Sequence, residues 1–257
     1  MKKNILILTF LFCACFSLQA QDALTIVRES RDRVKAETVS TRSRMLVQTK
    51  NYSINMLIDQ YSKDGPKGHR TVIVFQEPAD IKGTRFLTME NQGKTDDRWI
   101  YSPKLGGEPN RMGASDGSKS FQGTDFSNDD ISSASRSAEL DTHTLLREED
   151  LNGSLCYVIQ SVPKDSSFQY SKMIQWIDKS TKVTMKIELY NRAGVLVKIL
   201  EILKLQEIQG HLTIMSTRMN TLSESSSTTL NVERIEYDRP IPESVFTPNF
   251  LKTGSTR

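Results

Sequence analysis

The feature that most limits the fold is a strand-like pattern that begins near residue 45 and recurs almost to the C-terminus. Short apolar or alternating runs such as Met45–Val47, Ile54–Ile58 and Thr71–Phe75 are separated by clusters of Gly, Pro, Asn and Asp. In a strand the side chains alternate between two faces, and such clusters mark turns. Repetition of strand and turn predicts an antiparallel meander rather than βαβ units.

About eleven runs of this kind can be found along the chain. The other runs are Arg85–Met89, Arg98–Tyr101, Cys156–Val162, Lys172–Asp178, Val183–Tyr190, Val195–Leu205, His211–Met219 and Thr228–Tyr237. A first helix is expected over Asp22–Glu37, and a short one starts near Ser127, where S-N-D-D resembles a capping box. Between them, Ser102–Gly123 is rich in Gly, Ser and Pro and is expected to be a long loop. We therefore predict an α+β, mostly β fold, built on a single strongly curved antiparallel sheet with helices on one face.

The N-terminus has the layout of a secretory signal peptide. Lys2 and Lys3 precede an almost wholly apolar run over residues 4–16, and Ser17-Leu18-Gln19-Ala20 follows it. We expect residues 1–20 to be removed and residues 21–257 to form a single exported, periplasmic domain. Lipidation of Cys15 is an alternative that would anchor the protein to a membrane.

Composition and cysteine usage exclude several classes of protein. With 34 basic and 31 acidic residues the formal charge is only +3, so no basic excess favours nucleic-acid binding. Cys156 would be the only cysteine left after cleavage at Ala20, and its apolar neighbours indicate a buried, unreactive thiol. His69, His143 and His211 lack the spacing of metal ligands, so no metal is expected.

One short motif suggests a different chemistry. Gly113-Ala114-Ser115-Asp116-Gly117 matches G-x-S-x-G, and Asp141 and His143 or His211 follow in the chain order of an α/β-hydrolase. That motif requires a buried strand before the serine and a helix after it. The Gly- and Ser-rich surroundings predict neither, so we expect no hydrolase chemistry here.

Five segments in order along the chain are similar to those of a known family. They are Pro78–Leu87, Asp97–Pro103, Phe121–Phe126, Lys172–Asp178 and Ile241–Thr247. Together they resemble the bacterial outer-membrane lipoprotein-sorting proteins, a LolA/LolB-like superfamily. The residues that match its motifs are Pro78, Gly83, Trp99, Tyr101, Phe121, Gly123, Asp125 and Phe126.

The resemblance implies a half-open β-barrel in which helices cover the concave face of one bent sheet. It also implies an apolar cavity for lipid or lipoprotein acyl chains, envelope membrane proteins as partners for loading and release, no cofactor and no enzymatic activity. Gln122 and Thr124 depart from the family motif, which has Met and Ser there. No segment aligns with the arginine that controls the lid of the family's chaperone.

Candidate cavity residues follow from this expectation. Methionine adapts to irregular apolar ligands, and aromatic rings suit the mouth of a cavity. The same residues would also suit an ordinary filled core, in which case the sheet would serve as a docking module of the cell envelope. The candidates are Met45, Val47, Met56, Ile58, Trp99, Tyr101, Trp176, Met185, Ile187, Leu189 and Met215.

Overall fold

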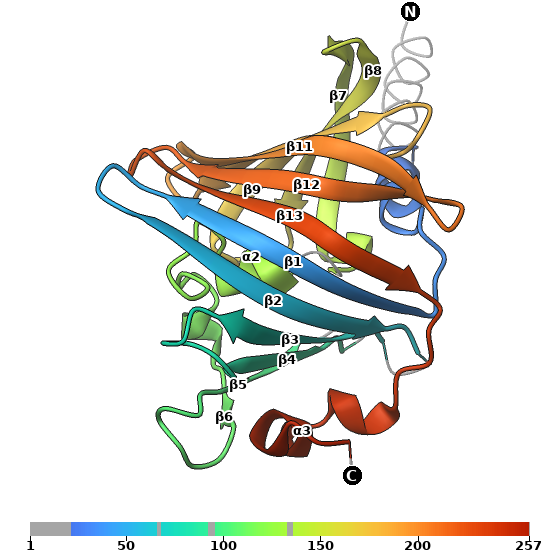
Figure 1. Ribbon diagram of the computed structural model, residues 1–257. Helices are drawn as coiled ribbons and strands as arrows, with labels where there is room; N and C mark the ends of the chain where they lie inside the picture. Colours follow the sequence, from blue (N-terminus) through green and yellow to red (C-terminus); the bar gives the residue numbers. More distant parts are fainter. Residues whose placement is uncertain (1–21, 66–67, 92–95, 133–135, 257) are drawn as a thin grey trace, which may run out of the picture. The chain divides into compact units, whose positions relative to one another are not determined.

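The computed structural model describes residues 22–65, 68–91, 96–132 and 136–256. The predicted signal peptide and Cys15 lie outside these residues. Thirteen strands and a few short helices are found within them, so the predicted mostly β class is confirmed (Figure 1). None of the described helices has the length and apolar character needed to cross a membrane.

The chain forms two compact units. The larger contains Val34–Ser137 and Lys198–Arg257, and its strands follow the hydrogen-bonded order β6-β5-β4-β3-β2-β1-β13-β12-β11, all antiparallel. Their bounds are β1 (Thr38–Gln48), β2 (Ser53–Lys63), β3 (Arg70–Glu77), β4 (Arg85–Met89), β5 (Asp97–Tyr101), β6 (Asn110–Arg111), β11 (Leu196–Ile208), β12 (His211–Thr221) and β13 (Ser226–Tyr237).

Pairing in this sheet assigns side chains to two faces. Residues directly opposite each other in neighbouring strands share a face, so the pairs of Met45 with Met56 and of Met45 with Leu230 place these three together. Ile58 pairs with Phe75 in the same way. We call this side of the sheet the inner face; Arg42, Arg44 and their neighbours lie on the outer face.

The C-terminal residues cover the outer face of β3 to β5. The helices η4 (Glu243–Phe246) and α3 (Pro248–Thr253) place Val245, Phe246, Phe250 and Leu251 against Val72, Val74 and Leu87. Thr247 caps α3 by accepting a hydrogen bond from the backbone N–H of Phe250 at 3.2 Å. The family motif at Ile241–Thr247 thus belongs to a packed hydrophobic cluster.

The smaller unit contains the chain up to Arg33 and Ala138–Val197. Its antiparallel strands follow the order β10-β9-β8-β7. Residues 22–31 are helical, and Ala23, Ile26 and Val27 pack against Ile159 and Ile177. The bounds are η3 (Ala138–Leu140), β7 (Asp141–Leu151), β8 (Ser154–Pro163), β9 (Tyr170–Asp178) and β10 (Thr184–Asn191).

The prediction of about eleven strands was too low. The two strands that it missed are β6, which has only two residues inside the expected long loop, and β7. β7 carries Arg147, Glu148, Glu149 and Asp150, so its second half has no apolar alternation to recognise. The first helix was also predicted too long, since helical structure ends at residue 31 rather than at Glu37.

Candidate functional site

A segment between β6 and the smaller unit's first strand covers part of the inner face. Residues 112–132, which we call the covering segment, contain η1 (Ala114–Asp116) and α2 (Asn128–Ser132). The predicted capping box is present: the backbone N–H of Asp130 donates to Ser127 Oγ at 3.0 Å, and that of Ser127 donates to Asp130 Oδ2 at 2.8 Å. Two reciprocal bonds satisfy helix-end donors, which explains why a helix of five residues forms here.

Three aspartates attach the covering segment to distant strands. Asp129 accepts a hydrogen bond from Arg98 Nη1 of β5 at 2.8 Å. Asp130 Oδ2 lies 2.9 Å from Lys198 Nζ of β11. Asp125 forms two hydrogen bonds with the hydroxyl of Thr228 in β13. The hydroxyl donates to Asp125 Oδ2 at 2.7 Å, and the backbone N–H of Asp125 donates to the hydroxyl oxygen Oγ1 at 2.9 Å.

These carboxylates are shielded from water. The side chains of Asp129 and Arg98 are 14% and 10% exposed, and those of Asp130 and Lys198 are 5% and 15% exposed. Loss of one partner from a shielded pair leaves a charge without compensation. The three attachments therefore fix the covering segment over the sheet.

Aromatic packing supplies the apolar part of the same contact. The ring of Phe121 lies 4.6 Å from that of Phe86 and 5.4 Å from that of Phe75, measured between centroids. Gly123, two residues later, has a φ of +79°, a conformation that favours glycine. The motif Phe121–Phe126 thus combines a buried ring, a left-handed turn and the Asp125 attachment.

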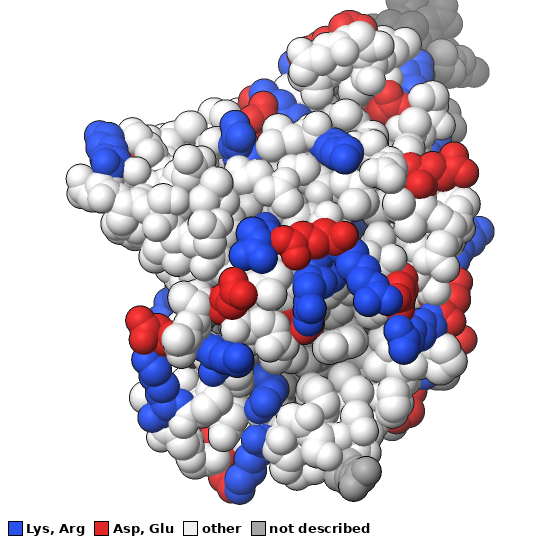
Figure 2. Space-filling view, in the orientation of Figure 1, with Lys and Arg blue, Asp and Glu red and all other residues white. Residues whose placement is uncertain are grey.

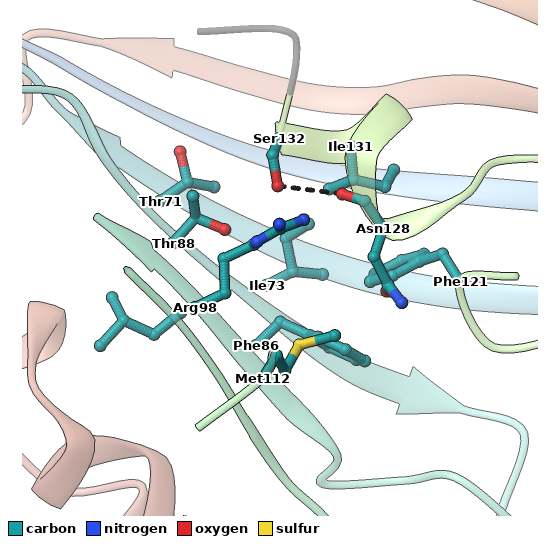
Figure 3. Close-up of a pocket in the computed structure, with 11 residues that line it drawn as sticks. Thr71, Ile73, Phe86, Thr88, Arg98, Met112, Phe121, Asn128, Ile131 and Ser132 are labelled. Atoms are coloured by element: carbon teal, nitrogen blue, oxygen red, sulfur yellow. Dashed lines mark hydrogen bonds between the residues drawn. The ribbon is translucent and has the colours of Figure 1, made fainter. Parts of the chain in front are cut away.

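A small pocket lies beneath the covering segment (Figure 3). Its apolar wall includes Ile73, Phe86, Met112, Phe121 and Ile131. Its empty space, which includes space open to solvent, is about 300 Å³. Polar side chains are added to this wall by Thr71, Thr88, Arg98, Asn128 and Ser132.

The outer face over β13, β1 and β2 is polar. Figure 2 shows acidic and basic side chains mixed there. Arg44 donates to Glu233 at 2.8 Å and to Glu77 at 3.2 Å, and Arg42 forms two bonds with Asp59. The ion pairs with Glu233 and Asp59 raise the pKa values of Arg44 and Arg42. The mixture of signs gives no single-sign patch over these strands.

The candidates of the larger unit fall on both faces. Met45, Val47, Met56 and Ile58 share the inner face and are at most 3% exposed. Met215 lies on β12 and is only partly buried. Trp99 and Tyr101 lie on the outer face, packed against the C-terminal cluster. The structure therefore does not bring these two rings together with the methionines.

The candidates of the smaller unit are also divided. Ile187 and Leu189 pair with Gln175 and Met173. Met185 instead packs against the cluster of Cys156, Val158 and Trp176. A register shift between Thr184 and Lys186 explains the difference, because an extra residue in one strand interrupts the alternation that the sequence suggested.

Sequence reasoning missed the cationic partners of the covering segment. Arg98 and Lys198 are separated from Asp129 and Asp130 by 31 and 68 residues, and no local pattern connects them. Charged residues in strands are usually expected at the surface, so no sequence pattern indicated that Arg98 or Lys198 would form a shielded ion pair. Thr228 is fully buried, and only its position in an alternating strand could have placed it on the inner face.

The hydrolase motif does not have the geometry that its chemistry needs. Ser115 lies in η1, and the element before it is the two-residue, exposed strand β6. Asp116, in the next position, accepts the backbone N–H of Gly113 at 2.8 Å, so the motif forms a local turn. His143 is occupied elsewhere, by Ser161 at 2.7 Å and the carbonyl oxygen of Ala138 at 2.9 Å.

Cys156 is buried, as predicted, and is fully covered by its neighbours. Burial, reinforced by the charge of Asp178, raises the pKa of its thiol to about 11. The thiolate, which is the reactive form, is therefore scarce at neutral pH. In the described residues, no group of three His, Cys, Asp or Glu side chains is arranged to hold a metal ion.

Comparison with known proteins identifies one matching family model. A family model with the description "-like: Uncharacterized protein" matches residues 67–253. No curated protein matches the chain significantly.

Three solved structures share the fold over most of their length. A DUF1329 family protein from Desulfovibrio piger is 25% identical, with a TM-score of 0.86 over 91% of this chain and 99% of that one. A domain assigned to the outer membrane lipoprotein-sorting proteins, from Vibrio parahaemolyticus, is 25% identical, with a TM-score of 0.85 and the same coverage. A LolA superfamily protein from Nitrosomonas europaea is 21% identical, with a TM-score of 0.72 over 89% and 98% of the two chains, and it supports the fold alone.

Proposed function

The chain belongs to the LolA/LolB-like superfamily of bacterial outer-membrane lipoprotein-sorting proteins, and from this premise we propose that it carries lipid or lipoprotein acyl chains. The proposed ligand is held by burial of apolar surface rather than by chemistry on its bonds. Each methylene removed from water contributes about 0.8 kcal/mol. A carrier therefore needs an apolar face and an entrance, and no catalytic group.

The observation that carries this proposal is the continuity of the inner face. Met45 of β1 pairs with Leu230 of β13, which pairs with Thr217 of β12. Thr217 in turn pairs with Ile202 of β11, and the next inner-face pair of these two strands is Met219 with Leu200. Apolar side chains therefore extend from the buried methionines across β13, β12 and β11. Leu200, Ile202 and Leu230 are only partly buried. They offer apolar surface that a bound chain would remove from water.

The proposed lining of the ligand site combines residues predicted from the sequence with Leu200, Ile202 and Leu230. Met45, Val47, Met56 and Ile58 would form its floor once the covering segment moves away. Met215 would contribute from β12. Trp176, Met185, Ile187 and Leu189 of the smaller unit, and Trp99 and Tyr101 on the outer face of the larger one, are proposed as separate contacts for acyl chains and not as part of this lining.

The proposed setting is the periplasm. The signal-peptide pattern of residues 1–20 supports export, with lipidation of Cys15 as the anchored alternative. The proposed partners are envelope membrane proteins that load and release the ligand. The half-open β-barrel that the resemblance implies is part of the same proposal.

Native mass spectrometry of the mature protein, purified without detergent, tests this proposal. Co-purified phospholipid or acylated peptide is the expected result, and uptake of a fluorescent fatty-acid probe should accompany it. A matched control is the same protein after delipidation and refolding, which should take up the probe again. Absence of lipid together with failure to take up the probe would overturn the carrier proposal.

A second candidate function rests on the burial of the predicted lining. Because Met45 and Val47 are at most 1% exposed, the inner face around these two residues is filled. A filled interior suits a non-enzymatic docking module that presents its sheet to other envelope proteins. The same mass-spectrometric experiment separates the two functions, since only a carrier retains lipid.

A further inference from the structure

The pocket beneath the covering segment has unequal ends. Ile73, Phe86 and Phe121 form an apolar wall, whereas Thr88 and Arg98 bring polar groups from β4 and β5. Figure 3 shows the guanidinium of Arg98 pointing toward α2, between the threonines and Asn128. An acyl chain joined to a polar group has this same division into a long apolar and a short polar part.

The polar end has hydrogen-bond donors to spare. A guanidinium carries five N–H groups, and within the described residues the side chain of Arg98 uses only Nη1, toward Asp129. Among those residues the hydroxyl of Thr88 makes no hydrogen bond. A ligand that supplies an acceptor would therefore bind donors that no described protein group occupies.

Charge balance selects the kind of acceptor. The charge of Arg98 is already matched by Asp129 at 2.8 Å, and both side chains are at least 86% buried. A carboxylate or phosphate would bring a second negative charge next to Asp129. A neutral acceptor adds hydrogen bonds without that repulsion.

We propose that this pocket binds the carbonyl group of an acyl ester or amide, with Arg98 and Thr88 donating to its oxygen. The proposal rests on the function proposed above and names the part of the ligand that is recognised. The empty space of about 300 Å³, which includes space open to solvent, admits a carbonyl group beside Arg98 and Thr88. The hydrocarbon then extends along Phe86 and Phe121 and onto the inner face.

Matched ligands test the carbonyl directly. Displacement of a bound fluorescent acyl probe is measured with a 1-monoacylglycerol, the 1-alkylglycerol ether of equal chain length and the free fatty acid. The ester and the ether differ only in the carbonyl group. We expect the ester to bind about three- to tenfold more tightly than the ether, which is the effect of a typical hydrogen bond.

Two variants connect this preference to the pocket. Thr88→Val removes one donor, and the double substitution Arg98→Gln with Asp129→Asn removes both charges while keeping a hydrogen-bonded pair. Each should bring the affinities of ester and ether close together. Thr41→Val, on β1 and outside the pocket, is the matched control and should keep the full preference. Thermal unfolding of each variant shows whether it has folded.

The outcomes are distinct. Equal affinity for ester and ether in the wild-type protein overturns the carbonyl site but leaves acyl-chain binding intact. Tighter binding of the free fatty acid would identify an anion site and overturn the choice of a neutral acceptor. If the fluorescent probe itself fails to bind, both the carbonyl site and the carrier function are wrong.

Discussion

At the scale of single residues, His143 shows how a buried polar group is made stable. The imidazole is 3% exposed. Its Nε2–H donates to the carbonyl of Ala138, and its Nδ1 accepts from Ser161, whose oxygen accepts in turn from Gln175 at 2.7 Å. Both ring nitrogens of the neutral imidazole therefore have a hydrogen-bond partner, which fixes the tautomer that is protonated at Nε2. A proton added at Nδ1 would meet a hydroxyl that is already donating.

This arrangement predicts a pH-dependent stability. Burial lowers the pKa of His143 below the usual 6.5, so in acid the unfolded chain takes up a proton before the folded one. The contribution is complete above about pH 6.5 and decreases as the pH falls below it. His143→Gln, which cannot titrate, should lose less unfolding free energy than the wild type between about pH 7.5 and about pH 5.5. Urea unfolding at both pH values measures this, and identical pH dependence of the two proteins would contradict it.

Cys156 leads to a second prediction at this scale. With its thiol covered and its pKa raised to about 11, it should not react with a thiol reagent near neutral pH in the native protein. The same thiol should react at once in denaturant. The measurement uses a chain in which Cys13 and Cys15 are replaced by serine, so that only Cys156 is counted. Rapid modification of the native form would show that the cluster around Cys156 opens readily.

At the scale of elements, the ion pairs of the covering segment can be ranked by burial. Lys198→Met removes the cation next to Asp130, whose side chain is 5% exposed, and should cost about 3 kcal/mol of unfolding free energy. Lys119→Met breaks the pair with Asp116, in which the lysine is 68% exposed, and should cost much less. Denaturant unfolding gives both values. Limited proteolysis should cut residues 112–132 faster in the Lys198 variant only; equal rates would show that Lys198 does not hold the segment.

The same elements show what the sequence can and cannot predict. The capping box at Ser127 was predictable because its donors and acceptors lie within four residues of one another. The attachments of Arg98 and Lys198 were not, since the strand order that brings them to α2 is a property of the whole sheet. β7 was missed for a related reason: it ends the strand order of its unit, and charged residues are typical of such edges.

At the scale of the whole molecule, the carrier and docking functions differ in how affinity depends on acyl-chain length. If the inner face takes up the chain, each added methylene is removed from water and contributes about 0.8 kcal/mol, or about fourfold in affinity. A docking surface that only touches the end of a chain gains nothing from added length. A series of monoacylglycerols of increasing length therefore separates the two.

We expect the affinity to rise steeply with chain length and then to level off, because the partly buried stretch of Leu200, Ile202 and Leu230 is finite. Thermal stability should follow the same order, since a ligand that binds only the folded state stabilises it in proportion to its occupancy. Ile202→Asp should reduce the slope, because a chain lying across β11 would then have to bury a charge. Glu201→Asp, on the neighbouring position of the opposite face, is the control and should keep the slope. Affinity that does not depend on length, in a protein that is folded, would favour the docking module.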